Sequence, residues 1–155
     1  MAHVPKRLFV ISILFGIILG VFSSIYSGNI NQEKKHIFIS FQKVSVMAKV
    51  ADNDALWVLG LSGIKSLSDK EGLWFDFLSD GRHSIWMKEM NFPIDIIWFD
   101  KNFQVVYIKE NATPESFPET FTPTSFDRFV LEVPSGFVQK YAVFLGEKVT
   151  VNKTP

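Results

Sequence analysis

The chain has 155 residues, which is enough for one domain of ordinary size. Its 16 basic and 16 acidic residues give a formal net charge of zero, so the bulk charge does not favour a nucleic-acid partner. The absence of cysteine excludes disulfides, thiol catalysis and thiolate metal sites. We therefore expect no nucleic acid, no metal and no cofactor among the partners.

Residues 8–26 form a long apolar run, and no charged residue occurs between Arg7 and Glu33. A helix over residues 8–26 spans roughly 28 Å, close to the hydrocarbon thickness of a bilayer. Lys6 and Arg7 precede the run in the way that positive residues begin a signal sequence. We predict a signal anchor within residues 1–30 that places a single-pass protein in the cell membrane. Cleavage of a signal peptide, followed by secretion, is the alternative.

Residues 27–32 are polar, so residues 31–43 are predicted to be a linker with a possible first strand. The globular domain is expected over residues 44–155. Positive residues lie on both sides of the apolar run and do not decide its orientation. The short N-terminal tail and the signal-like arrangement favour a domain on the extracytoplasmic side.

The first half of the domain combines alternating apolar and polar residues with one helix signal. Strands are predicted over residues 44–50, 72–78 and 83–90. Residues 52–54 (DND) offer a cap for a short helix that continues to about Leu61. Asp80 and Gly81 support a positive φ, so a hairpin is expected to join the second strand to the third.

The second half begins with residues 94–99 (IDIIWF), which are apolar on both faces and predict a central strand covered on both sides. A turn at 100–103 leads to a return strand over 104–109. Three prolines and four threonines interrupt any period over residues 111–126, which predicts a long loop. The remaining predicted elements are a strand over 128–133, a helical turn over 135–141 and a strand over 148–151.

Together these elements predict a mainly β domain with about seven short strands and one or two short helices. The expected architecture is a compact small barrel or sandwich, preceded by the N-terminal transmembrane or signal helix.

Three charged residues, Lys88, Asp95 and Glu132, lie in predicted strands among large apolar residues. An isolated buried charge is costly, so such groups are normally paired. One interpretation is a cluster that lines a pocket, in which burial tunes a carboxylate as a proton acceptor. The alternative, which we favour, is a structural ion pair or polar anchors that bond the backbone of the long loop.

The four tryptophans are candidates for an aromatic ligand platform or for core packing. Trp86 and Trp98 lie in the most apolar predicted strands, so we expect them in the core. Truncation of Trp86 to Ala is then expected to cost about 3–5 kcal/mol. Trp57 on the short helix is the best candidate for an exposed, ligand-binding tryptophan.

The long loop supplies two further ligand-binding candidates, Thr113 and Thr122, because loops often carry function. The alternative is that the loop is only a cover. His83 has no neighbouring ligand at metal-binding spacing, so we expect no metal site there.

Residues 86–100 (WMKEMNFPIDIIWFD) resemble the hallmark of a family called domain of unknown function 192, in which WMKNT is followed by P-L-D and an apolar strand ending in Asp. Further matches lie at Gly60-Leu61, at Glu71-Gly72-Leu73 with Phe75, at Ala112 with Pro114, at residues 129–132 with Gly136, and at Gly146 with Val149. The resemblance covers roughly residues 44–151. It implies a small, mainly β domain, often behind an export signal, and no established activity.

No nucleophile elbow, phosphate-binding glycine loop or zinc helix is present in the sequence. The leading hypothesis is therefore a membrane-tethered, extracytoplasmic binding or accessory module without catalysis. Its ligand would be a small molecule, a glycan or a protein, and its lipid partner the bilayer around residues 8–26. The alternative is a hydrolase or transferase that uses Asp95 or Glu132 as general base with Lys88 as partner.

Overall fold

A computed structural model describes residues 35–153 of the chain. The predicted signal anchor lies outside these residues. Within residues 35–153, no helix has the length and apolar character needed to cross a membrane.

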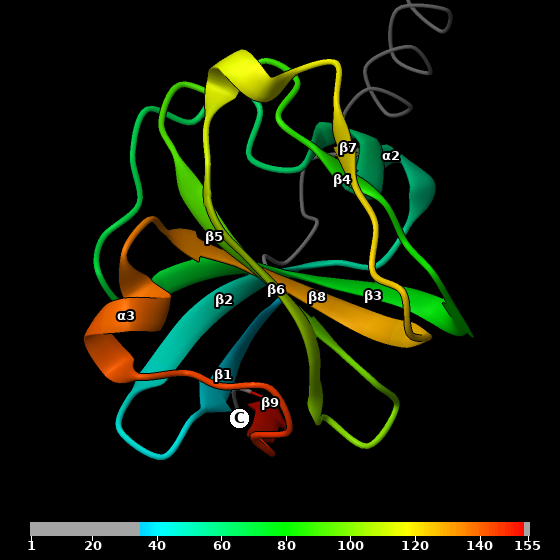
Figure 1. Cartoon of the computed structure of the whole chain (residues 1–155), viewed down its shortest axis with the longest axis vertical. Coiled ribbons are helices and arrows are strands. Elements are labelled where there is room, and N and C mark those ends of the chain that lie inside the picture. The colour runs from blue at the N-terminus through cyan, green and yellow to red at the C-terminus, as the bar shows by residue number, and fades with distance from the viewer. Residues whose placement is uncertain (1–34, 154–155) are drawn as a thin grey trace, which may run out of the picture. The chain divides into compact units, whose positions relative to one another are not determined.

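Seven strands form one mixed sheet in the order β6-β5-β8-β3-β2-β1-β9, and β4 and β7 form a separate two-stranded sheet (Figure 1). The strands are β1 (His36–Ser40), β2 (Ser45–Ala51), β3 (Glu71–Gly81), β4 (Ile85–Trp86), β5 (Ile94–Phe99), β6 (Val105–Ala112), β7 (Thr120–Phe121), β8 (Asp127–Pro134) and β9 (Thr150–Lys153). The helices are α2 (Asp54–Leu59) and α3 (Phe137–Tyr141), with a 3₁₀ turn, η1 (Pro114–Ser116). The prediction of a mainly β domain with short helices is confirmed.

The main sheet begins earlier than residue 44, because β1 pairs antiparallel with both β2 and β9. The possible first strand in the predicted linker is therefore part of the folded domain. The last strand also starts slightly later than the predicted 148–151.

The two edges of the main sheet are linked at one end. The backbone N–H of Val105 donates to the carbonyl of Glu147 at 2.9 Å, and the N–H of Val149 donates to the carbonyl of Phe103 at 3.0 Å. These bonds join the start of β6 to the segment that leads into β9. The sheet thus curves until its outer strands meet at this end, rather than dividing into two stacked sheets.

The predicted hairpin at residues 79–82 is wrong. β3 pairs in parallel with β2 and antiparallel with β8, whereas the two-residue β4 pairs with β7. The chain after β3 is held elsewhere by side chains distant in sequence. The carboxylate of Asp127 accepts from the backbone N–H of His83 at 3.0 Å, and the indole N–H of Trp98 donates to the carbonyl of His83 at 2.8 Å.

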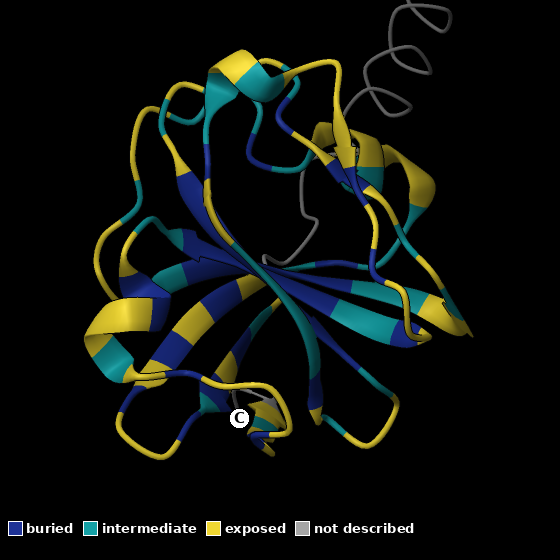
Figure 2. Cartoon of the chain, viewed as in Figure 1, coloured by how far each residue is buried: buried dark blue, intermediate teal, exposed yellow. Residues whose placement is uncertain are grey.

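Strand β5 lies at the centre of the domain, and all six of its residues are buried. Its side chains alternate between two hydrophobic clusters, with Ile97 and Phe99 in one and Ile96 and Trp98 in the other. Figure 2 shows buried residues concentrated on the central strands. The prediction of a central strand covered on both sides is confirmed, as is the core position of Trp98.

Asp95 is the polar exception in β5, with an exposed fraction of 1%. One carboxylate oxygen accepts from the backbone N–H of Asn111 at 2.9 Å, and the other accepts from the backbone N–H of Val138 at 2.9 Å. Asp95 therefore anchors the end of β6 and the start of α3 to the central strand.

Replacing Asp95 with Asn is expected to destabilise the domain by about 1–3 kcal/mol. The NH2 of the new side chain would face one of the two backbone N–H groups, and it has no acceptor to offer to that group. Urea unfolding measures this loss. The matched control is Asp80→Asn, which changes a carboxylate whose side chain is 45% exposed and should leave the midpoint unchanged. Equal midpoints for wild type and Asp95→Asn would contradict the anchoring role.

Candidate functional site

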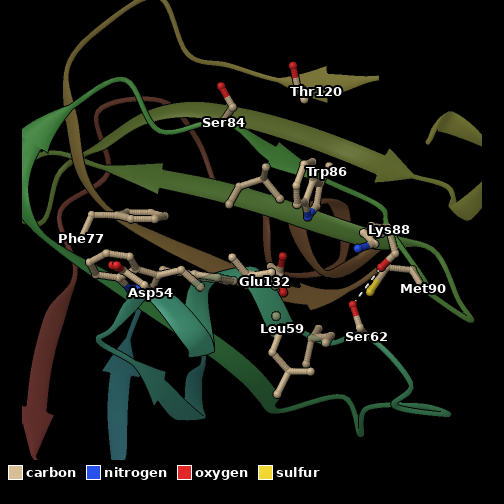
Figure 3. Close-up of a pocket in the computed structure, with 16 residues that line it drawn as sticks. Asp54, Leu59, Ser62, Phe77, Ser84, Trp86, Lys88, Met90, Thr120 and Glu132 are labelled. Carbon is tan, nitrogen blue, oxygen red and sulfur yellow. Dashed lines mark hydrogen bonds between the residues drawn. The ribbon is translucent and has the colours of Figure 1, made fainter. Parts of the chain in front are cut away.

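A pocket of about 490 Å³ opens beside α2. Its walls come from α2 and the turn that follows, from β3, from the segment around β4 and from β7, while β8 contributes Glu132 (Figure 3). Apolar and aromatic side chains dominate the lining. The charged residues in it are Asp54, Lys88 and Glu132.

Helix α2 is positioned by caps that the sequence encodes. The side chain of Asn53 accepts from the backbone N–H of Leu56 at 3.1 Å, which is a standard N-cap. Gly60 ends the helix at φ 51°, a backbone conformation that favours glycine. Trp57 is fixed by its indole N–H, which donates to the carbonyl of Ala51 at 3.0 Å, and by its ring against Phe77. This wall of the pocket is therefore held in place from both ends.

Glu132 lies in the middle of β8, between Leu73 of β3 and Ile96 of β5. A methyl group on Gly72 would come within 2.7 Å of the Glu132 carbonyl, so glycine is required for the two strands to approach here. Glu132 is only 3% exposed, and its Oε2 atom has no hydrogen-bond partner among residues 35–153. Burial raises the pKa of this carboxyl from 4.5 to about 8.

Lys88 enters the same pocket from the segment after β4, and its amino group points into the space beside Glu132 (Figure 3). Its backbone carbonyl accepts from the hydroxyl of Ser62 at 2.8 Å, which joins this segment to the turn after α2. Within residues 35–153, the ion pairs present do not include Lys88 or Glu132. The two groups share a pocket without neutralising each other.

The three charged candidates are therefore only partly brought together. Lys88 and Glu132 line one pocket, whereas Asp95 is bonded to the backbone and lies outside the pocket lining. The two interpretations of the sequence thus apply to different residues: Asp95 has the contacts of a polar anchor, and Lys88 and Glu132 have the placement of a site.

The expectation that Trp86 belongs to the core is wrong. Trp86 is 43% exposed and lines the pocket, with its ring packed edge-on against Phe117. The residue lies in a two-residue strand where one face meets the core and the other meets solvent, so its neighbour Ile85 takes the buried position. Val58 and Leu59 of α2 are also more than half exposed at the pocket.

Among the other ligand candidates, Trp57 lines the pocket and the two threonines do not. Thr113 precedes η1, and its carbonyl accepts from the hydroxyl of Ser116 at 2.7 Å. Thr122 is exposed, and its hydroxyl shares a hydrogen bond of 2.7 Å with Ser84, which does line the pocket. Thr120 is the residue of the long loop that reaches the lining directly.

A His–Asp pair that the sequence did not reveal lies near β3. The ring of His83 stacks on Phe77 at 4.0 Å and its Nδ1 atom lies 2.7 Å from the buried carboxylate of Asp127. Burial raises the pKa of Asp127, and the hydrogen bonds from His83 oppose this effect. The two residues are far apart in sequence, so only the pairing of β3 with β8 brings them together.

Replacing Glu132 with Gln should change how stability depends on pH. The carboxyl titrates near pH 4.5 when unfolded and near pH 8 when folded, so the folded state holds its proton more tightly. Between pH 4.5 and pH 8, the free energy of unfolding of the wild type should fall relative to that of Glu132→Gln by about 1.4 kcal/mol per pH unit. Above pH 8 the difference should level off. Denaturant unfolding at pH 5 and pH 8 measures the effect. A stability difference that does not change with pH would refute the buried, protonated carboxyl.

Solved structures share this fold, among them the following two. One is from Sinorhizobium meliloti 1021 and is described as a "putative transcription regulator"; it has a TM-score of 0.72 and 21% identity, over 80% of this chain and 98% of that chain. The other is a protein of unknown function from Novosphingobium aromaticivorans DSM 12444, with a TM-score of 0.67 and 23% identity, over 74% of this chain and 83% of that chain. At this identity the likeness shows the fold alone.

No curated protein matches the chain. Residues 37–151 match the family model DUF192, which is described as "Uncharacterized ACR". The match extends over most of the domain and includes the β4 segment, β5 and β8, which carry Lys88, Asp95 and Glu132. The chain therefore belongs to the domain of unknown function 192 family.

Proposed function

We propose that this protein is a membrane-tethered, extracytoplasmic module that binds a small molecule in the pocket beside α2, without catalysis. The observation that carries the proposal is the carboxyl of Glu132, which is buried in the pocket wall with one oxygen unpaired among residues 35–153. A buried polar group without a partner costs about 1–3 kcal/mol. A ligand that bonds to this oxygen would recover that cost.

The shape and lining of the pocket support the same proposal. Small-molecule sites typically enclose about 300–1,000 Å³ and combine apolar walls with a few polar groups that orient the ligand. The pocket, at about 490 Å³, lies in this range. Trp57, Phe77 and Trp86 supply flat apolar surface, and Lys88 and Glu132 supply the polar groups.

Two hydroxyls of the pocket, those of Ser62 and Ser84, favour binding over nucleophilic catalysis. Ser62 donates to the carbonyl of Lys88, and Ser84 shares its hydrogen bond with Thr122. Within residues 35–153, neither of these two hydroxyls is hydrogen-bonded to a general base, as an activated nucleophile would be. The alternative, a hydrolase or transferase with Glu132 as general base, is favoured by one observation: a pKa of about 8 suits proton transfer near neutral pH. Lys88 would then stabilise developing negative charge.

Replacing Trp86 with Ala should abolish or weaken ligand binding while costing about 1 kcal/mol of stability or less, because the side chain is half exposed at the pocket. A thermal-shift screen of small molecules against the full-length chain supplies the ligand; at 100 times its dissociation constant a binder adds about 2.7 kcal/mol of stability. The matched control is Phe126→Ala, which removes an aromatic that is 71% exposed and outside the pocket lining. This site would be contradicted if both variants lost binding equally, or if neither variant lost binding.

The full-length chain should sediment with membranes and require detergent for release, and a chain that begins at residue 31 should not. Protease added to intact cells or spheroplasts should digest the domain, because it is proposed to lie on the extracytoplasmic side. Full-length protein that stays in the supernatant with its N-terminus intact would contradict the tether.

A further inference from the structure

We propose that the ligand of this pocket is an amphipathic monoanion, a carboxylate carrying an apolar alkyl or aryl group, whose carboxylate lies between Lys88 and Glu132. This inference rests on the binding function proposed above and assigns its chemistry. Lys88 enters the pocket from the turn after β4 and Glu132 enters it from β8, and no ion pair within residues 35–153 joins the two side chains (Figure 3). Each therefore remains available to the same ligand group.

The charges that face the pocket set the sign of the ligand. They are Lys88 from the segment after β4, Glu132 from β8, and Asp54 from the first turn of α2. Asp54 is exposed, so solvent screens its charge, whereas Lys88 is half-buried and lies beside apolar walls. An ammonium group in such surroundings gains most from an anionic oxygen, which forms a charge-assisted hydrogen bond.

Glu132 is compatible with an anion because it is buried. Desolvation raises the pKa of its carboxyl to about 8, so near neutral pH the group is protonated and donates a hydrogen bond. A carboxylate has two oxygens and can accept from Lys88 and from Glu132 together. A cationic ligand would require ionised Glu132 in a buried site and would lie close to Lys88. An alcohol carries a single oxygen and no charge to match the ammonium group.

The rest of the pocket accounts for the apolar part of the ligand. Trp57 and Phe77 pack against each other on one wall, and Trp86 lies on another, above Glu132 in Figure 3. Leu59 and Val58 extend this apolar surface to solvent. A molecule with its carboxylate at Glu132 would therefore bring its alkyl or aryl group into contact with aromatic and aliphatic side chains along its length.

The test compares three probes that share one apolar group and differ at the polar end: phenylbutanoate, phenylbutylamine and phenylbutanol. Calorimetric titration uses the full-length chain in detergent. Phenylbutanoate should bind most tightly. Lys88→Met should weaken its binding by about tenfold or more, the size of effect expected for a charge-assisted hydrogen bond. Lys101→Met, which alters an amino group on a side chain 69% exposed, should not change it.

The pH dependence gives an independent readout. Phenylbutanoate needs the protonated form of Glu132, so its affinity should fall by about tenfold between pH 7 and pH 9. Glu132→Gln keeps a donor and does not titrate, so the affinity of this variant should be constant over the same interval.

Tighter binding of the amine, with affinity that rises from pH 7 to pH 9, would overturn the proposal that the ligand is an anion. The pocket would still be a binding site. Equal binding of phenylbutanoate and phenylbutanol would do the same. Binding of all three probes that is unaffected by Trp86→Ala, or no binding of any probe, would overturn both the anion and the proposed pocket.

Discussion

Strand β8 is the element on which the rest of the domain depends, because it pairs with β3 on one side and with β5 on the other. It joins the half of the sheet formed by β3, β2, β1 and β9 to the half formed by β5 and β6. A strand in this position is buried on both faces, and the apolar side chains of residues 129–133 each pack into one of the two hydrophobic clusters. Glu132 is placed at the middle of this strand, where an apolar residue would serve packing better. Its position in a wall that opens to a pocket is the main observation behind the proposal that the pocket binds a ligand.

The sequence predicted the local elements well where the signal was local. Residues 52–54 predicted a cap for α2, which Asn53 provides, and the uniformly apolar run of β5 predicted a central strand. The predicted turn between β5 and β6 is also present, and Phe103 adopts a positive φ in it. Each of these features depends on interactions within a few residues, which a single sequence displays directly.

The failures arose where distant partners override a local preference. Asp80 and Gly81 are favourable for a hairpin, but Asp127 holds the backbone of His83 from the neighbouring strand, and β3 continues to Gly81. Trp86 was placed in the core because its sequence neighbours are apolar; its exposure depends on pairing with β7, which comes from the long loop. For the same reason, only two of the three charged residues predicted from the sequence share a pocket. Lys88 and Glu132 are separated by most of the second half of the chain, and only the path of the chain through β5 and β6 brings them into one pocket.

The bridge between the start of β6 and the segment before β9 has a consequence for how the protein behaves in a crowded solution. Strands β6 and β9 are the outermost members of the sheet, and unpaired edges invite pairing with another chain. The backbone N–H of Val105 donates to Glu147, and the carbonyl of Val105 accepts from Gly146, so part of the edge of β6 is already paired within the domain. Gly146 has a φ of 89°, which turns the chain toward Val105. Residues 146–149 therefore close the sheet by pairing with the start of β6. A fusion or truncation that loosens residues 146–149 would uncover β6 and promote self-association, even though the pocket on the other side of the molecule's central strands keeps all of its residues.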